Sequence, residues 1–310
     1  MSKIAFIYPG QGAQKAGMGA DFYENSKTAR DIYDEASRVL GLDMKELCFE
    51  KNDRLDLTEY TQAAMVTTCL AMTRVIEEMG VSPAVTAGLS LGEYCAIAAA
   101  GGFDDMDAVR TVRKRGILMQ NTVPAGEGAM AAVLGMEKEA IEQTLASMED
   151  VTIANYNCPG QIVITGRAGA VKEACEKLKE AGARRTMPLN VSGPFHSPML
   201  EKAGKELAKE LEKSSWKSLT IPYVTNVTAK EVTDISQTPG LLARQVSAPV
   251  RWEQSMERMI QSGVDVFVEI GPGKTLTGFL KKIAPEKKVM QLGVWEDLEK
   301  IIEEWNKHCI

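Results

Sequence analysis

The pentapeptide Gly88-Leu89-Ser90-Leu91-Gly92 lies between a short apolar run, residues 84–88, and a run of small and apolar residues, 91–100, that is typical of a helix. A strand that turns sharply into a helix at such a G-x-S-x-G sequence strains its serine, and the flanking glycines let the chain pass closely. Free N–H groups at the start of the helix favour negative charge there. The alternative is that Ser90 has a structural role alone, as the N-cap of the helix. The strand before Ser90 and the helix after it favour a nucleophile.

Strands and helices alternate on both sides of this turn, which predicts an α/β fold with a mainly parallel sheet, similar to an α/β-hydrolase core. The elements expected from periodicity and from turn residues are strands at Lys3–Tyr8, 84–88, 221–225 and 264–270, and helices at 28–40, 61–79, 91–100, 105–121, 199–213 and 252–262.

A different order of elements occupies the middle of the chain. The pattern predicts strands at 129–134, 151–156, 161–165 and 186–191 and helices at 137–148 and 170–181, with a hairpin turn around Asn157-Cys158-Pro159-Gly160. The order βαββαβ is that of a ferredoxin-like unit. We therefore expect a discontinuous catalytic domain, residues 1–125 and 197–310, and an inserted ferredoxin-like subdomain, residues 126–196.

Composition excludes several classes of protein. The 310 residues carry 36 Lys and Arg against 42 Asp and Glu, a net charge of −6, which predicts no overall attraction for nucleic acid or for an anionic membrane. The longest apolar stretch near the start, Ile4–Tyr8, is too short for a signal peptide, and no run is long enough to span a bilayer. None of the 6 cysteines forms a C-x-x-C pair, so we expect reduced thiols, no metal site and a cytoplasmic location.

Two glycine-rich loops resemble phosphate-binding motifs without completing them. The third glycine of a dinucleotide fingerprint that starts at Gly10 would fall at position 15, which is Lys15. A P-loop ending in Gly273-Lys274-Thr275 needs a glycine where this chain has Val268. The sequence therefore does not predict a nucleotide site at either loop.

A serine nucleophile needs a base, and the chain contains only 2 histidines. His308 lies two residues from the end of the sequence, where we expect a mobile segment. His196 lies in the rigid segment Gly193-Pro194-Phe195-His196-Ser197, which leads back from the predicted subdomain. Taken alone, His196 can equally be a hydrogen-bonded structural residue, but pairing with Ser90 favours a catalytic base.

Arg115 lies on the apolar stripe of the predicted helix 105–121, whereas Arg110, Arg113 and Lys114 fall outside that stripe and are expected to be solvated. A guanidinium directed at the core needs an anionic partner. That partner is either an Asp or Glu of this chain or the carboxylate of a substrate. The sequence leaves both interpretations open.

Five segments resemble, in the right order, the signatures of the malonyl-CoA:acyl carrier protein transacylases of bacterial type II fatty acid synthesis, over essentially the whole chain. They are Tyr8-Pro9-Gly10-Gln11-Gly12-Ala13-Gln14, Gly88-Leu89-Ser90-Leu91-Gly92-Glu93-Tyr94, Gly193-Pro194-Phe195-His196-Ser197, Arg244-Gln245-Val246-Ser247-Ala248-Pro249-Val250-Arg251-Trp252 and Glu269-Ile270-Gly271-Pro272-Gly273-Lys274. Many members of this family have a histidine immediately before the serine, whereas this chain has Leu89.

The resemblance implies a ping-pong transfer of the malonyl group from malonyl-CoA to the phosphopantetheine thiol of an acyl carrier protein. Ser90 would carry the malonyl group as an ester, and His196 would act as general base and then as general acid. The backbone carbonyl of Gln245 would orient the imidazole. The N–H groups of Gln11 and Leu91 would form the oxyanion hole.

Arg115 would then bind the malonyl carboxylate, and the enzyme would need no cofactor of its own. The acidic carrier protein predicts a local basic patch, for which Arg184-Arg185 and Lys281-Lys282 are candidates. We expect a monomer. Three other interpretations compete with this one. They are a serine thioesterase or hydrolase with the same serine turn at Gly88–Gly92, a non-catalytic docking module for the carrier protein, and a malonyltransferase that serves a polyketide pathway.

Overall fold

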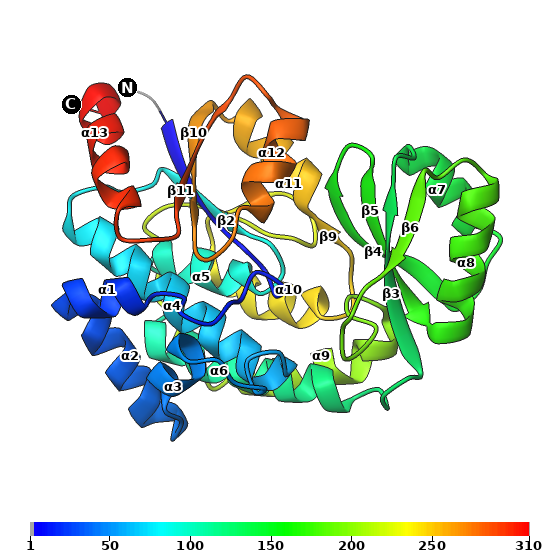
Figure 1. The fold of residues 1–310 in the computed structure, drawn as a ribbon, viewed down its shortest axis with the longest axis horizontal. Coiled ribbons are helices and arrows are strands. Elements are labelled where there is room, and N and C mark those ends of the chain that lie inside the picture. Colours follow the sequence, from blue (N-terminus) through cyan, green and yellow to red (C-terminus); the bar gives the residue numbers. More distant parts are fainter. Residues whose placement is uncertain (1–2, 310) are drawn as a thin grey trace.

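The computed structural model describes residues 3–309, without the side chains of His308 and Cys309, and contains two sheets (Figure 1). The expectation of a mobile His308 therefore concerns a side chain outside the described residues. The strands of the larger sheet are, in spatial order, β11 (Lys288–Leu292), β10 (Val264–Ile270), β1 (Lys3–Tyr8), β2 (Val85–Gly88), β7 (Tyr223–Val224) and β8 (Glu231–Val232). All neighbours in it are parallel except β7 and β8. The predicted α/β class with a mainly parallel sheet is confirmed.

Both faces of the larger sheet are buried, as expected for parallel strands. Ile4, Phe6 and Tyr8 of β1 point into one hydrophobic core, and the alternating Ala5 and Ile7 point into a second. The first core is formed with residues from α1 (Ala20–Asn25), α2 (Lys27–Leu40), α3 (Met44–Phe49), α4 (Thr58–Glu78), α5 (Gly92–Ala99), α6 (Asp105–Asn121), α9 (Glu201–Leu211), α10 (Thr238–Gln245) and α13 (Asp297–Cys309). The second core is formed with α11 (Trp252–Gln261) and α12 (Thr275–Ile283).

The smaller sheet lies beside the larger one, at the right in Figure 1. Its strands are, in spatial order, β6 (Arg185–Pro188), β3 (Gly128–Leu134), β5 (Gln161–Arg167), β4 (Val151–Cys158) and β9 (Val250–Arg251). The helices α7 (Lys138–Leu145) and α8 (Ala168–Glu180) pack on it around a third core. The first four strands have the order of a ferredoxin-like unit. Because β9 comes from outside residues 126–196, the boundaries of the two domains stay predictions.

Several predicted bounds differ from the observed ones. Asn157 and Cys158 belong to β4 rather than to the hairpin turn, which contains only Pro159 and Gly160. The predicted strand 186–191 ends at Pro188, and the helix expected from residue 199 begins at Glu201, after a 3₁₀ turn at Pro198–Leu200. Within residues 3–309, no helix is long and apolar enough to cross a membrane.

Candidate active site

Ser90 lies in the turn between β2 and α5, and its φ angle of 51° is in the left-handed region that residues other than glycine rarely adopt. The glycines on either side are required by close packing. A Cβ atom added to Gly88 would lie 1.9 Å from the carbonyl carbon of Gly92, and one added to Gly92 would lie 2.2 Å from the carbonyl oxygen of Tyr8. The two glycines therefore let the backbone at Gly88 contact the backbone at Gly92, and the backbone at Gly92 contact the end of β1.

Asn226, which follows β7, holds this turn from the neighbouring strand. Its Oδ1 accepts a hydrogen bond from the Ser90 N–H at 2.6 Å, and its Nδ2 donates to the Gly88 carbonyl at 2.7 Å. Asn226 is fully buried. The strained backbone at Ser90 is thus stabilised by a side chain 136 residues away in the sequence.

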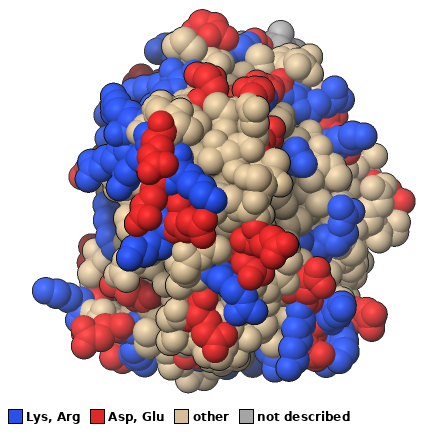
Figure 2. Space-filling model, turned by 90° about the vertical axis from the view of Figure 1, so that its right-hand side faces the viewer, with Lys and Arg blue, Asp and Glu red and all other residues tan. Residues whose placement is uncertain are grey.

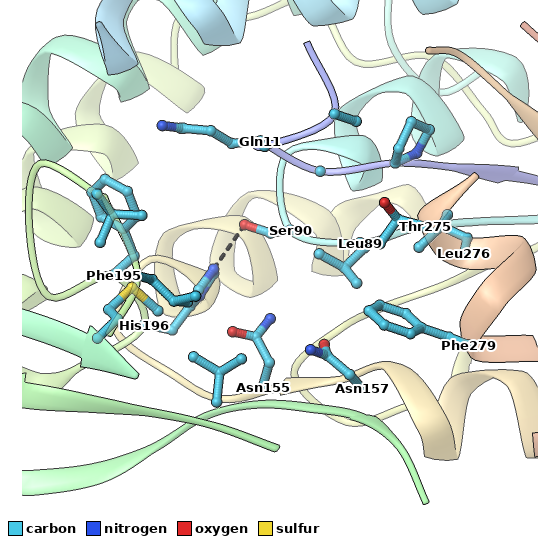
Figure 3. Close-up of a pocket in the computed structure, with 18 residues that line it drawn as sticks. Gln11, Leu89, Ser90, Asn155, Asn157, Phe195, His196, Thr275, Leu276 and Phe279 are labelled. Atoms are coloured by element: carbon cyan, nitrogen blue, oxygen red, sulfur yellow. Dashed lines mark hydrogen bonds between the residues drawn. The ribbon is translucent and has the colours of Figure 1, made fainter. Parts of the chain in front are cut away.

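His196 contacts Ser90 directly, and its own φ of 59° is also in the left-handed region. Its Nε2 lies 2.7 Å from Ser90 Oγ (Figure 3), and its Nδ1 lies 2.7 Å from the carbonyl oxygen of Gln245. Because a carbonyl oxygen only accepts, the proton of the neutral ring lies on Nδ1, and Nε2 is free to accept from the serine hydroxyl. Burial, and secondarily the charge of Arg115, lowers the pKa of His196 to about 4. The ring is therefore a neutral base at physiological pH.

Arg115 is 1% exposed and donates to Ser90 Oγ at 3.1 Å, to Gln62 Oε1 at 2.9 Å and to Gln245 Oε1 at 3.0 Å. Among residues 3–309, no ion pair involves this guanidinium, and its Nε atom has no hydrogen-bond partner. The pairing with an internal carboxylate, which the sequence left open, is thus not formed. Burial lowers the pKa of Arg115. A buried cation without a bound anion beside a reactive hydroxyl is suited to receive an anionic ligand.

Arg113 departs from the sequence expectation in another way. It was expected to be solvated, but it is half-buried, forms an ion pair with Glu59 at 2.7 Å and stacks over the ring of Tyr60. The exposed Arg110 and Lys114 agree with the expectation. A long side chain at the edge of an apolar stripe can bury its stem while its charge finds a partner, which helical periodicity alone does not reveal.

The carboxyl group of Glu93 lies beneath this cluster and is fully buried. It accepts hydrogen bonds from Gln245 Nε2 at 2.6 Å and from the Asn226 N–H at 3.2 Å. Since a carboxylate only accepts and Arg115 only donates, the amide of Gln245 is held with its nitrogen toward Glu93 and its oxygen toward Arg115. Burial raises the pKa of Glu93 to about 7, although its hydrogen bonds act in the opposite direction.

The backbone N–H groups of Gln11 and Leu91 donate to no acceptor among the described residues. Leu91 immediately precedes α5, so its N–H is one of the free donors at a helix start. Gln11 belongs to the loop after β1, and its side chain is tethered to Thr58 Oγ1 at 3.0 Å. Both N–H groups are thus free to donate to a ligand atom.

A cavity of about 250 Å³ opens over Ser90 and His196 between the two sheets (Figure 3). Both glycine-rich loops that lack complete phosphate motifs contribute to its wall, through Gly10 and Gly12 and through Thr275. The N-terminus of α12 is not free for a phosphate, because the buried carboxyl group of Glu269 accepts from the N–H groups of Leu276 and Thr277 at 3.0 and 2.8 Å. Within the described residues, no cluster of His, Cys, Asp and Glu could hold a metal ion.

The structure brings together all six residues singled out in the sequence, Ser90, His196, Gln11, Leu91, Arg115 and Gln245, and adds others that the sequence analysis missed. Those are Gln62, Glu93, Asn155, Asn157 and Asn226. One signal was visible: Asn226 directly follows a predicted strand, at the end of the parallel sheet where ligand sites form. The amide residues of β4 had no such signal, because Asn155 was expected inside the strand 151–156 and Asn157 in the hairpin turn that follows it.

The sequence of this chain is similar to those of known acyltransferases. Residues 5–296 match the model of the acyl transferase domain family. The malonyl CoA-acyl carrier protein transacylase of Bacillus subtilis (strain 168) is 44% identical over 308 residues, which are 98% of this chain and 97% of that protein. The transacylase of the same name from Staphylococcus aureus (strain MRSA252) is 39% identical over 313 residues, 99% of this chain and all of that one.

The fold of this chain is also similar to those of solved malonyltransferase structures. The crystal structure named MCAT from Streptococcus pneumoniae superposes with a TM-score of 0.94 at 44% identity, covering 97% of this chain and 100% of that one. A malonyl-transacylase solved in complex with a holo acyl-carrier protein of a type II polyketide synthase superposes with a TM-score of 0.95 at 37% identity, covering 98% of this chain and 100% of that one.

Proposed function

The chain belongs to the acyl transferase domain family, and from this premise and the geometry above we propose that it is an acyl-carrier-protein S-malonyltransferase. It transfers the malonyl group of malonyl-CoA to the phosphopantetheine thiol of an acyl carrier protein, which supplies the extender unit of fatty acid synthesis. The observation that carries the substrate class is Arg115, a buried guanidinium 3.1 Å from Ser90 Oγ with no ion pair among the described residues.

In the first half-reaction, Ser90 Oγ attacks the thioester carbonyl while Nε2 of His196 takes the hydroxyl proton. The carbonyl oxygen becomes an oxyanion that accepts from the N–H groups of Gln11 and Leu91. When the tetrahedral intermediate collapses, the C–S bond breaks and the leaving sulfur takes the proton from His196. The carbonyl of Gln245 stabilises the imidazolium between these steps.

The second half-reaction reverses the first with a different thiol. The phosphopantetheine thiol of the carrier gives its proton to His196 and attacks the serine ester, and Ser90 leaves with that proton. Throughout both steps Arg115 binds the malonyl carboxylate, so an uncharged acyl group would leave a buried cation unpaired. No step needs a further cofactor, and we propose none.

The carrier protein is expected to be acidic and to dock on a basic surface near the cavity. Lys281 and Lys282 continue α12 beyond the residues that line the cavity, and both are exposed without an ion pair in the described chain. Arg184 and Arg185 are likewise exposed at the start of β6. The face that carries α7 and α8 mixes Lys and Arg with Asp and Glu (Figure 2). We propose that the carrier protein docks between these two basic pairs.

We also propose that the protein is a monomer and is located in the cytoplasm.

Intact-protein mass spectrometry tests the reaction. After brief incubation with malonyl-CoA, one malonyl adduct is expected on Ser90, and acetyl-CoA in parallel is expected to label far less. A holo acyl carrier protein should then discharge the adduct and gain its mass. Loss of the adduct to water as quickly as to the carrier would instead identify a thioesterase. Absence of both adduct and CoA release would leave only a docking module.

A further inference from the structure

The hydroxyl of Thr58 is shared by two segments that each carry part of the catalytic site. Gln11 Nε2 donates to Thr58 Oγ1 at 3.0 Å, and Thr58 Oγ1 lies 2.6 Å from Oγ of Ser192. Gln11 belongs to the loop after β1, and Ser192 lies in the segment that leads to His196. Thr58 itself is fully buried at the start of α4. One hydroxyl therefore connects the loop of an oxyanion donor with the segment of the proposed base.

The backbone N–H of Gln11 lies in a loop without regular secondary structure. Residues 9–14 belong to no helix or strand, and a glycine stands on either side of Gln11. Glycine permits more backbone conformations than any other residue, so the neighbouring residues do not fix the direction of this N–H. Leu91, the other proposed oxyanion donor, is instead fixed at the start of α5. A preorganised pair of donors therefore requires an anchor for the loop.

Two glutamine side chains connect this loop to the start of α4. The side chain of Gln11 ends at Thr58 Oγ1, and in Figure 3 it extends on the side of Phe195. Gln14 donates from Nε2 to Asp56 Oδ1 at 3.1 Å, but that contact is exposed. The contact of Gln11 ends on a fully buried residue, where water competes less for the hydrogen bond. It is therefore the stronger of the two restraints on the loop.

The backbone of Thr58 is itself held by α6. A Cβ atom added to Gly116 would lie 2.8 Å from the carbonyl oxygen of Thr58, so α6 contacts the start of α4 directly at this glycine. One turn further along α6, Oε1 of Gln120 accepts from the N–H of Glu59 at 3.3 Å. The hydroxyl of Thr58 thus projects from a position that two packed helices define.

We propose that Thr58 is a positioning residue whose hydroxyl holds the side chain of Gln11 and thereby keeps the backbone N–H of Gln11 at the oxyanion position. Ser192 contacts the same hydroxyl and restricts its rotation. Thr58 does not line the cavity, so it acts through Gln11 and not on the substrate. This inference rests on the proposed function and extends it. Because an oxyanion forms in both half-reactions, the tether serves the acylation of Ser90 and the discharge of its ester alike.

Thr58→Val, which replaces the hydroxyl by a methyl group, tests this role. The maximal rate of malonyl adduct formation is expected to fall at least about tenfold, because a displaced oxyanion donor weakens binding of the transition state. The Kd of coenzyme A, which forms no oxyanion, should not change. Thr58→Ser keeps the hydroxyl and should regain most of the rate. A wild-type rate in Thr58→Val would overturn the inference.

Thr67→Val is the matched control. Thr67 is fully buried in the same helix, and its hydroxyl has no hydrogen-bond partner among the described residues. The same chemical change there removes no tether, so the rate of adduct formation should stay at the wild-type value. A loss as large as that of Thr58→Val would show that α4 tolerates no valine at a buried threonine, and it would refute a specific role of Thr58.

A double-variant cycle distinguishes positioning through Gln11 from any other effect of Thr58. Gln11→Ala keeps the backbone N–H and removes the tether from its other end. If Thr58 acts through this side chain, the double variant should react no more slowly than the slower single variant. Rate losses that multiply in the double variant would show that Thr58 acts by another route, and they would overturn the inference.

An activated ester separates this inference from the transferase activity. Acyl transfer from p-nitrophenyl acetate to Ser90 forms the same kind of oxyanion and needs neither a malonyl group nor a carrier, and Ser90→Ala gives the background. If malonyl-CoA forms no adduct but Thr58→Val releases p-nitrophenolate about tenfold more slowly than the wild type, the proposed function alone fails. Equal release by both proteins would refute the positioning role. If neither ester acylates the wild type, both the function and the role fail.

Discussion

The guanidinium of Arg115 donates a hydrogen bond to Oγ of Ser90 across 3.1 Å, on the same oxygen that lies 2.7 Å from Nε2 of His196. The group proposed to bind the substrate carboxylate therefore already contacts the group proposed to attack. A carboxylate that enters the site competes with Ser90 for this donor. Under the proposed function, the binding of the substrate carboxylate and the release of Ser90 Oγ are therefore coupled through this one side chain.

Arg115→Ala is expected to lower kcat/KM for malonyl-CoA about 100-fold, the effect of losing a charge-assisted hydrogen-bonded pair. Acetyl-CoA, which has no carboxylate, should lose much less, so the preference between the two donors collapses. The preference is measured from adduct formation with each donor. Lys114→Ala, exposed on the same helix, is the control. An unchanged malonyl preference in Arg115→Ala would return this residue to a structural role.

Ser90→Ala is expected to abolish the malonyl adduct while the protein stays folded. The change removes the only atom proposed to form the ester and leaves the backbone contacts to Asn226 in place. Intact mass and circular dichroism measure the two effects. Ser147→Ala, at an exposed position, should load normally. A malonylated Ser90→Ala protein would disprove the assignment of the nucleophile.

The pH dependence of acylation should reflect the lowered pKa of His196. An ordinary histidine is mostly protonated at pH 5, whereas a pKa of about 4 keeps this ring neutral and basic there. We expect the acid limb of kcat/KM against pH to lie near 4. Because the charge of Arg115 helps lower this pKa, the limb in Arg115→Ala should move to higher pH. A wild-type limb near 6.5 would contradict the buried, neutral imidazole.

Gly92→Ala is expected to destabilise the protein by several kcal/mol and to abolish loading, since its Cβ would lie 2.2 Å from the Tyr8 carbonyl oxygen. Gly169→Ala is the matched control. Gly169 lies within α8 with nothing within 4 Å of an added Cβ, so alanine there should stabilise the helix by up to about 1 kcal/mol. Urea unfolding of both variants measures the difference. Equal stabilities of the two variants would show that the serine turn can move away from Tyr8 without loss of stability.

Glu93→Gln is expected to change the pH dependence of stability. The folded carboxyl has a pKa of about 7 against an unfolded value near 4.5, so the folded state binds more protons between these pH values. The free energy of unfolding therefore loses a contribution as pH rises from about 4.5 to 7. The neutral glutamine removes that loss. The free energy of unfolding of the wild type minus that of the variant should therefore fall as the pH rises over this range. Urea unfolding at pH 5 and 7 tests it; a constant difference would contradict the raised pKa.

Elements with strong local patterns were predictable. The bounds of β1, α6 and β10 match the expected strand 3–8, helix 105–121 and strand 264–270, and the βαββαβ order is observed. The two-residue strand β7 lies inside the expected strand 221–225, whereas β9 was not predicted. β9 contains two residues, and Val250 pairs in it with Asn155 of β4, a contact between distant segments. The periodicity of two residues is too weak to indicate a strand by itself.

For the site, the sequence by itself pointed to Ser90, His196 and Arg115 as candidates, because a serine turn between a strand and a helix, a histidine in a rigid segment and an arginine on an apolar stripe each have a local pattern. The tertiary structure decided how those groups are held and which others join them. Asn226 and Glu93 act through hydrogen bonds across more than 100 residues, and Asn155 and Asn157 depend on two bulges in β4. Hydrogen bonds between distant segments and slips in register leave no periodic trace in a sequence, since they arise only when the folded sheets bring those segments together.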